Sequence, residues 1–471
     1  MFERYFQLSA NRTTVRTELL AGVTTFLTMA YIIFVQPAVL SGAMFGMKTG
    51  MDFGAVTTAT CLSAALATGL MALYARYPIA QAPGMGQNFF FIFSAIPAAT
   101  AAGFADGWQA ALGAVFISGV LFLVMSLLGL REMIFDAVSP SMKNGIAVGI
   151  GLFIAFIGLQ DAGVILKDPE TAVKLNAHLM SPDLLVFFFG LLLTASLHAR
   201  RVRGSILWGI VGATALASVL KLALPHIASL ADSSLVAESK LIKQFEFAKG
   251  FIAAPPSLAP TFLKMDLRAA LSAAMWPFIF VFLFMLVFDA IGTLIGVSEQ
   301  AGFIKDNKLP RAKQAMLSDA VGTVAGAALG TSTVTSFIES AAGVEAGGRT
   351  GLTGLTTAAL FLLALFFSPV VAMIGSYPAI TAPALVVVGA MMCQNVMKIK
   401  WEDYSESVPA FLTLVGIPLT YSIADGMALG FISYPIIKFF SGRGREVRWL
   451  TYVLAVVLVA YFILVRRAMS K

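Results

Sequence analysis

The sequence contains little charge, few cysteines and few histidines. Of its 471 residues, 12% are Asp, Glu, Lys or Arg, whereas about 25% is usual for a soluble domain. The 2 cysteines lie in separate apolar stretches and the 3 histidines lie at the ends of such stretches or between them, so no disulfide framework or metal site is indicated. Hydrophobic residues make up 58% of the chain. These proportions exclude a soluble enzyme, a disordered regulator and a secreted disulfide scaffold, and they indicate an integral membrane protein.

Apolar stretches long enough to cross a bilayer occupy most of the chain. A spanning helix needs about 20 apolar residues, and this length predicts 14 spans, with a fifteenth apolar stretch at 449–465 that either crosses or lies along the membrane surface. The predicted spans are 17–40, 55–75, 78–97, 107–129, 141–161, 183–199, 204–223, 269–297, 314–330, 333–348, 351–375, 378–397, 407–423 and 424–440. The predicted fold is therefore all-α and embedded in the lipid bilayer.

Basic residues indicate the orientation of these spans. The net charge is +7, but the basic residues are spread thinly through short loops, which argues against binding to nucleic acid. With a cytoplasmic N-terminus and 14 spans, 20 Lys and Arg residues lie on the cytoplasmic side and 9 on the outer side. Because cytoplasmic loops carry an excess of Lys and Arg, we expect a multi-pass protein of the plasma (inner) membrane with its N-terminus in the cytoplasm.

A long polar loop divides the predicted spans into two sets of seven. We expect a first repeat at 1–223, an extracytoplasmic connecting loop at 224–266, a second repeat at 267–440, and a basic loop with a C-terminal apolar segment at 441–471. Because seven is odd, the second repeat would enter the membrane from the opposite face. This arrangement is an inverted repeat, which is common among secondary transporters.

The third and the tenth predicted spans are both interrupted. The third reads Tyr77-Pro-Ile-Ala-Gln-Ala-Pro-Gly-Met-Gly-Gln-Asn88, and the tenth reads Gly330-Thr-Ser-Thr-Val-Thr-Ser-Phe-Ile-Glu339. Irregular backbone at membrane depth is tolerated only where it is buried in protein or lines a water-filled cavity. Broken segments at corresponding positions of two repeats therefore predict a transport site between them.

Few acidic residues lie within the predicted spans, so each is a candidate for function. Glu339 in the tenth span has a carboxylate that accepts N–H donors from a neutral heterocycle and exchanges protons, unless neighbouring hydroxyls satisfy it in a structural role. Asp289 is the only charge between Trp276 and Ser298, and it serves proton coupling, substrate contact or the clamping of a broken segment. We expect Asp319, which closely follows a basic loop, to lie near the inner interface.

Two uncharged side chains beside the breaks are further candidates. The amide of Asn88 suits either the edge of a nucleobase or the carbonyl groups that a broken helix leaves free. Phe337 lies two residues before Glu339 and either stacks on a planar ligand or packs in the core. Other aromatic residues of the spans, including Phe89 to Phe91, are more typical of core or lipid-facing positions. No catalytic triad is present, so an enzyme is not expected.

Several stretches of the chain together resemble the AzgA-like branch of the nucleobase–cation symporters. They include Ala82-Pro-Gly-Met-Gly-Gln-Asn-Phe-Phe, Phe288-Asp-Ala-Ile-Gly-Thr-Leu-Ile-Gly-Val and Gly330-Thr-Ser-Thr-Val-Thr-Ser-Phe-Ile-Glu-Ser-Ala-Ala-Gly-Val. The resemblance implies uptake of adenine, guanine or hypoxanthine by proton symport through alternating access. It also implies a fold of 14 spans in two inverted repeats, with a core domain, a gate domain and no cofactor.

The resemblance also implies site residues. By motif, Asn88, Phe337, Glu339 and Thr28 correspond to positions that contact substrate, and Asp289 and Glu339 to positions that couple protons. The family usually carries Asp or Asn where Leu286 stands and Thr or Ser where Ala290 stands. A polar ligand contact is therefore missing, and the preferred purine stays open.

Two other carriers on the same fold remain as alternatives, an anion exchanger and a uracil or xanthine carrier. The carboxylate of Glu339 argues against the anion exchanger, because it repels anions. The expected partners are a purine nucleobase, protons and the bilayer, and a homodimer is an open alternative.

Overall fold

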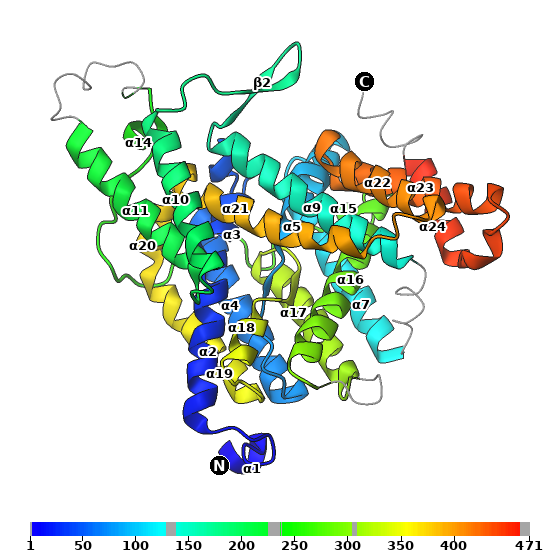
Figure 1. Cartoon of the computed structure of the whole chain (residues 1–471), viewed down its shortest axis with the longest axis horizontal. Helices are drawn as coiled ribbons and strands as arrows, with labels where there is room; N and C mark the ends of the chain where they lie inside the picture. The colour runs from blue at the N-terminus through cyan, green and yellow to red at the C-terminus, as the bar shows by residue number, and fades with distance from the viewer. Residues whose placement is uncertain (1, 129–137, 225–235, 237, 304–308, 462–471) are drawn as a thin grey trace.

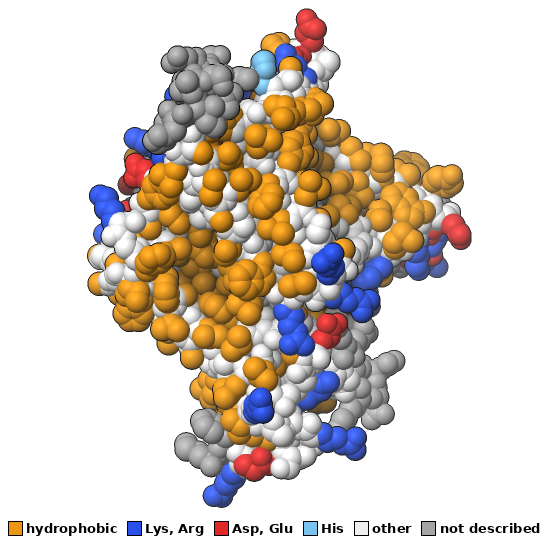
Figure 2. Space-filling model, turned by 60° about the vertical axis from the view of Figure 1, so that its left-hand side comes forward, with side chains coloured by type: hydrophobic (Ala, Val, Ile, Leu, Met, Phe, Trp, Pro, Cys, Tyr) orange, Lys and Arg blue, Asp and Glu red, His pale blue; other side chains and the backbone are white. Residues whose placement is uncertain are grey.

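The computed structural model describes residues 2–128, 138–224, 236, 238–303 and 309–461. The protein is mostly helical, and 9 helices of the described residues are long and apolar enough to cross a membrane. Figure 2 shows a broad hydrophobic surface with Lys and Arg side chains gathered at its margins. A surface this apolar suits lipid rather than water, in agreement with the composition.

The helices and strands follow the predicted order. Those before the connecting loop are α1 (Phe2–Phe6), α2 (Val15–Met29), α3 (Ile32–Leu40), α4 (Phe53–Leu70), β1 (Gln81–Pro83), α5 (Met85–Phe90), α6 (Ile96–Ala101), α7 (Gly107–Leu128), α9 (Pro140–Asp161), β2 (Ile165–Asp168), β3 (Ala172–Leu175), α10 (Pro182–Ala199) and α11 (Ser205–Ala223). Those within and after it are α14 (Lys240–Lys243), α15 (Leu267–Ala270), α16 (Trp276–Gln300), α17 (Ala312–Leu329), β4 (Val334–Ser336), α18 (Ser340–Glu345), α19 (Gly351–Ala364), α20 (Ser368–Gly375), α21 (Pro378–Cys393), α22 (Tyr404–Leu419), α23 (Ile423–Phe440) and α24 (Trp449–Tyr461). Every predicted span thus coincides with a helix or with a broken segment.

Local sequence explains where several of the long helices begin. Asp52 precedes α4, and its carboxylate accepts a hydrogen bond from the Ala55 N–H at 2.7 Å. Ser139 and Ser181 cap α9 and α10 in the same way, and in both helices a proline occupies the first turn. Side-chain caps of this kind satisfy N–H groups that the helix leaves unpaired, and proline suits the first helical position because its missing N–H is not needed there.

One predicted span differs from the structure, and the last apolar stretch is described only in part. The span predicted at 269–297 is divided, because α15 ends at Ala270 and α16 begins at Trp276. Pro277 follows at once, and proline favours the first turn of a helix over its interior. The last apolar stretch forms α24 and packs against α23, while residues 462–465 of that stretch lie outside the described residues, as do 225–235 of the connecting loop.

The expectation of a purely α-helical fold is wrong in detail, because two small antiparallel sheets are present. The strands β2 and β3 form a hairpin between α9 and α10, where Lys174 pairs with Asp168 at 2.7 Å. The strands β1 and β4 pair with each other although 250 residues separate them in sequence. Both sheets lie where no continuous apolar helix forms: one in a polar loop, the other where the third and the tenth predicted spans are broken.

Helices from the two halves of the sequence pack closely against each other. The helix α17 contacts α4 and α7, α19 contacts α2 and α4, and α21 contacts α9 and α10. In Figure 1, α2 and α19 run beside each other in the lower part of the molecule. The halves are therefore interleaved around a shared interior, and the paired strands β1 and β4 lie within it.

Candidate functional site

The interruptions of the third and the tenth segments meet in one place. The strands β1 and β4 are antiparallel, with Gln81 opposite Ser336 and Pro83 opposite Val334. The pairing extends beyond the strands, because the Gly84 N–H donates to the carbonyl of Thr333 at 2.9 Å. Each broken segment thus supplies backbone partners for the other, as buried backbone groups in a membrane require.

Threonine hydroxyls close both outer edges of this two-stranded sheet. Thr68 of α4 accepts from the Gln81 N–H at 2.9 Å and donates to the Gln81 carbonyl at 3.0 Å. Thr323 of α17 does the same for Val334, at 3.3 Å and 2.7 Å. A strand edge without a neighbouring strand leaves backbone N–H and C=O groups unpaired. In each half of the chain, a threonine of the helix before the broken segment therefore provides hydrogen-bond partners for these groups on the strand that follows.

Glu339 lies directly after β4 and before α18, and its side chain is half-buried. The hydroxyl of Tyr31 donates to Glu339 Oε1 at 2.9 Å, and the hydroxyl of Thr28 approaches the backbone carbonyl of Glu339 at 3.4 Å. Tyr31 and Thr28 lie at the junction of α2 and α3. The structure places the Thr28 hydroxyl, which donates to the Thr25 carbonyl at 2.7 Å, next to Glu339, and it adds Tyr31, which the sequence analysis missed.

Asp289 lies on α16, which packs against β4 and α18. Its carboxylate is half-buried, and Asp289 Oδ2 accepts a hydrogen bond from Gln87 Nε2 of α5 at 3.0 Å. Of the three roles open to Asp289, this contact favours clamping of the broken third segment. The sequence analysis also missed Gln87, because the sequence does not show which residue a glutamine in an apolar segment hydrogen-bonds.

Asn88 is fully buried next to a polar cluster that joins three segments. Its amide bonds with the side chains of Gln36 on α3 and Ser332 before β4, and Gln36 Nε2 also donates to Thr331 Oγ1 at 2.8 Å. Of its two possible roles, this arrangement favours fastening of the broken segments over contact with a ligand. Gln36 lies at the centre of the cluster and bonds with Asn88, Thr331 and Ser332.

Asp319 lies on α17 and is fully buried inside the protein. Its Oδ1 atom accepts from Gln81 Nε2 at 2.7 Å and from the Ser336 hydroxyl at 2.9 Å. Its expected position near the inner membrane interface stays a prediction, because burial within the protein does not fix its depth in the bilayer. Asp319 joins β1 and β4 on their polar side.

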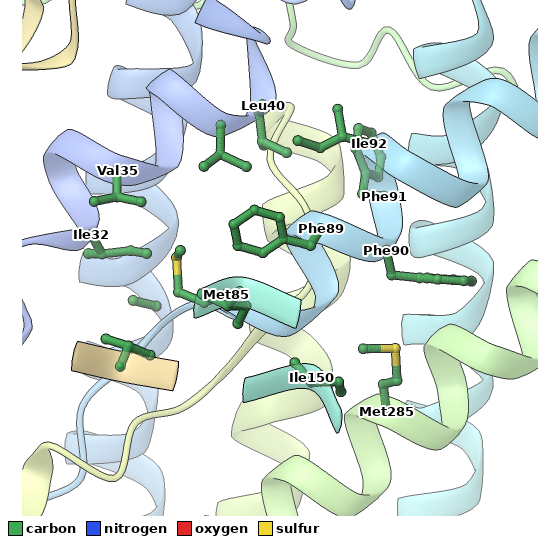
Figure 3. Packing of buried hydrophobic residues seen from close by; sticks show 14 of the residues in the cluster. Ile32, Val35, Leu40, Met85, Phe89, Phe90, Phe91, Ile92, Ile150 and Met285 are labelled. Carbon is green, nitrogen blue, oxygen red and sulfur yellow. The ribbon is translucent and has the colours of Figure 1, made fainter. Parts of the chain in front are cut away.

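The aromatic residues beside the breaks belong mainly to the core. Phe89 and Phe90 are fully buried on opposite sides of α5, and Phe90 packs against Phe278 and Phe282 of α16. Figure 3 shows Met285 of α16 and Ile150 of α9 close to the same helix. Phe337 is 6% exposed, so little of its surface is available to a ligand in this conformation.

Two half-buried carboxylates thus flank the crossing of the broken segments. Each accepts a hydrogen bond from a neutral side chain, and none of the ion pairs formed by the described residues involves Glu339 or Asp289. No cluster of metal-ligating residues occurs among the residues that the structure describes. The arrangement suits a polar, uncharged ligand with N–H donors, because carboxylates accept such bonds strongly.

Known proteins resemble this chain over nearly its full length. The Permease family (Xan_ur_permease) matches residues 16–429. The guanine/hypoxanthine permease PbuG of Bacillus subtilis is 44% identical over 98% of this chain and 99% of its own, and the adenine permease AdeP of Escherichia coli is 38% identical over 98% and 95%. The transmembrane domain of the cyanobacterial bicarbonate transporter BicA shares the fold, with a TM-score of 0.59 and 15% identity over 88% of this chain and 97% of that domain.

Proposed function

The chain belongs to the Permease family, whose members are membrane transporters and not enzymes, and from this membership we propose that it imports purine nucleobases by proton symport. The observation that carries the proposal is the close relation to permeases named for guanine, hypoxanthine and adenine, over more than nine-tenths of both chains. The site chemistry agrees, because purines are flat, neutral and rich in N–H donors.

The proposed architecture is a 7+7 inverted repeat of 14 spans with a cytoplasmic N-terminus. Residues 1–223 and 267–440 form the repeats, and 224–266 connects them on the outer side. The first four spans of each repeat form a core domain and the other three a gate domain. The likeness to BicA and the matching roles of Thr68 and Thr323 in the two halves support this plan.

Glu339 is the proposed anchor for the purine. Its carboxylate accepts ring N–H groups, Phe337 contacts a face of the base, and the Thr28 hydroxyl lies beside the backbone carbonyl of Glu339. Asn88 would contact the base only if its hydrogen bonds with Gln36 and Ser332 broke. We therefore propose that Asn88 mainly holds α5 in position. The geometry that supports these roles is the convergence of the α2–α3 junction, β4 and α18 on Glu339.

Proton coupling is proposed for Asp289 and Glu339. Each carboxylate lies between segments of the two repeats, so movement of core against gate changes its exposure to water and its hydrogen-bond partner. One proton that enters down a potential of about 100 mV contributes about 2.3 kcal/mol. At about 1.4 kcal/mol per factor of ten, that supports accumulation of a neutral base by roughly 50-fold.

Two alternative carriers share this fold. BicA transports bicarbonate according to its name, so an anion exchanger is the first. A site for anions should present basic groups, whereas Glu339 and Asp289 are carboxylates without an ion-pair partner among the described residues. A carrier of uracil or xanthine is the second, and only competition with purines separates it from the main proposal.

Uptake into proteoliposomes tests the proposal. We expect a pH gradient, acid outside, to drive accumulation of radiolabelled adenine, guanine or hypoxanthine, and Glu339→Gln to abolish it. The matched control is Glu402→Gln, which makes the same change at an exposed carboxylate away from the site. Equilibration of all three bases without any effect of the gradient would refute symport, and uptake of bicarbonate or uracil in their place would favour an alternative.

A further inference from the structure

An apolar groove opens on the hydrophobic surface, away from the candidate site. Its volume is about 240 Å³, and α2, α3, α11, α19 and α20 contribute to its walls. Phe26, Leu207 and Leu363 are among its lining residues, and Leu363 is 55% exposed. Figure 2 brings these elements forward from the left of Figure 1 and shows a hydrophobic face that is hollowed near its centre.

A basic turn lies at one end of this groove. Arg200, Arg201 and Arg203 occupy the exposed turn between α10 and α11, one helical turn before Leu207. The Arg203 guanidinium reaches Thr24 on α2 at 3.5 Å, just ahead of Phe26. The turn that carries the three arginines therefore lies at the end of the groove that Leu207 and Phe26 form.

These arginines have no acidic partner in the part of the chain that the structure describes. None of its ion pairs involves Arg200, Arg201 or Arg203, and only the weak contact of Arg203 with a neutral hydroxyl is present. Three unpaired guanidinium groups at a membrane surface attract phosphate, to which arginine can donate two parallel hydrogen bonds.

The combination of groove and turn matches one class of ligand. We propose that an anionic phospholipid binds here, with its phosphate on Arg200, Arg201 and Arg203 and one acyl chain along the groove. Zwitterionic lipid also offers a chain, but its net charge is zero. Basic pockets between transmembrane helices commonly bind anionic headgroups. The apolar groove provides a second contact, which a lipid can fill with an acyl chain and a soluble headgroup cannot.

The position of this lipid has a consequence that rests on the proposed function. The groove lies between α2, α3, α19 and α20, which belong to the proposed core, and α11, which belongs to the proposed gate. A bound lipid would therefore touch both parts that move during transport. Binding is measured without transport, so failure of the lipid proposal and failure of the transport proposal are distinguishable.

Native mass spectrometry of the purified full chain in detergent tests the proposal. Dioleoylphosphatidylglycerol should bind and withstand delipidation, whereas dioleoylphosphatidylcholine should not. Replacing all three arginines by glutamine should weaken binding on the order of 100-fold, because each basic side chain near an anionic headgroup contributes several-fold. The matched control is Lys398→Gln with Lys400→Gln, an exposed basic pair elsewhere, which should leave binding unchanged.

A second pair of variants tests the groove. Leu363→Trp fills it and should weaken binding of phosphatidylglycerol roughly tenfold, as expected when one or two methylenes are displaced. Leu362→Trp adds the same bulk at an adjacent exposed position that does not line the groove, and should have no effect. Equal binding of both lipids, no loss in either variant set, or competition by soluble glycerol 3-phosphate would overturn the proposal.

Discussion

The hydrogen bond between Tyr31 and Glu339 gives the sharpest test of the candidate site. Tyr31→Phe removes only the hydroxyl that donates to Glu339 Oε1 at 2.9 Å, and the ring, which is 2% exposed, leaves no cavity. A hydrogen bond to a charged group contributes about 1.5–3 kcal/mol. Because Glu339 is half-buried and partly screened by water, we expect the lower end, a loss of about tenfold in apparent affinity.

The assay is the KM for uptake of radiolabelled purine into proteoliposomes. Tyr377→Phe is the matched control, because its hydroxyl donates to the carboxylate of Asp183 at 2.6 Å, between the start of α21 and α10, which do not contribute residues to the candidate site. Both variants lose a tyrosine–carboxylate bond, so a general loss of stability affects them alike. If Tyr31→Phe and Tyr377→Phe have the same KM, Tyr31 does not orient a carboxylate that binds purine, and the reasoning fails.

Four further predictions concern coupling, specificity and stability. Asp289→Asn should reduce gradient-driven accumulation from roughly 50-fold to near unity while purine exchange across the membrane persists; loss of both activities would argue against a coupling role. Leu286→Asn, at a fully buried position one turn from Asp289, should change at least tenfold which purine competes best for uptake. Glu18→Gln should lower the melting temperature by several degrees, because the Glu18 carboxylate accepts five hydrogen bonds at the start of α19. The Lys174 ammonium holds the pKa of Asp168 down to about 2; this stabilisation of the β2–β3 hairpin is full above the unfolded pKa of about 3.9 and is lost as the pH falls toward 2, which hydrogen exchange of the hairpin amides would show.

The sequence determined the positions of the spans and of the two interruptions. Hydropathy and helix-breaking residues act locally, so a window of about 20 residues contains the information that sets a span. Pro83 and Gly84, followed by a second glycine, and the hydroxyl-rich stretch before Glu339 are likewise local signals. The sequence also singled out Glu339 and Asp289, because an isolated charge in an apolar segment is conspicuous.

Only the tertiary structure decided the partners of these residues. Tyr31 and Glu339 are 308 residues apart, and Gln87 and Asp289 are 202 apart. The pairing of β1 with β4 buries Asp319 between distant segments. A carboxylate in an apolar helix indicates that hydrogen-bond donors must lie nearby. Which donor bonds to it depends on how distant helices pack, and neither composition nor periodicity predicts that packing.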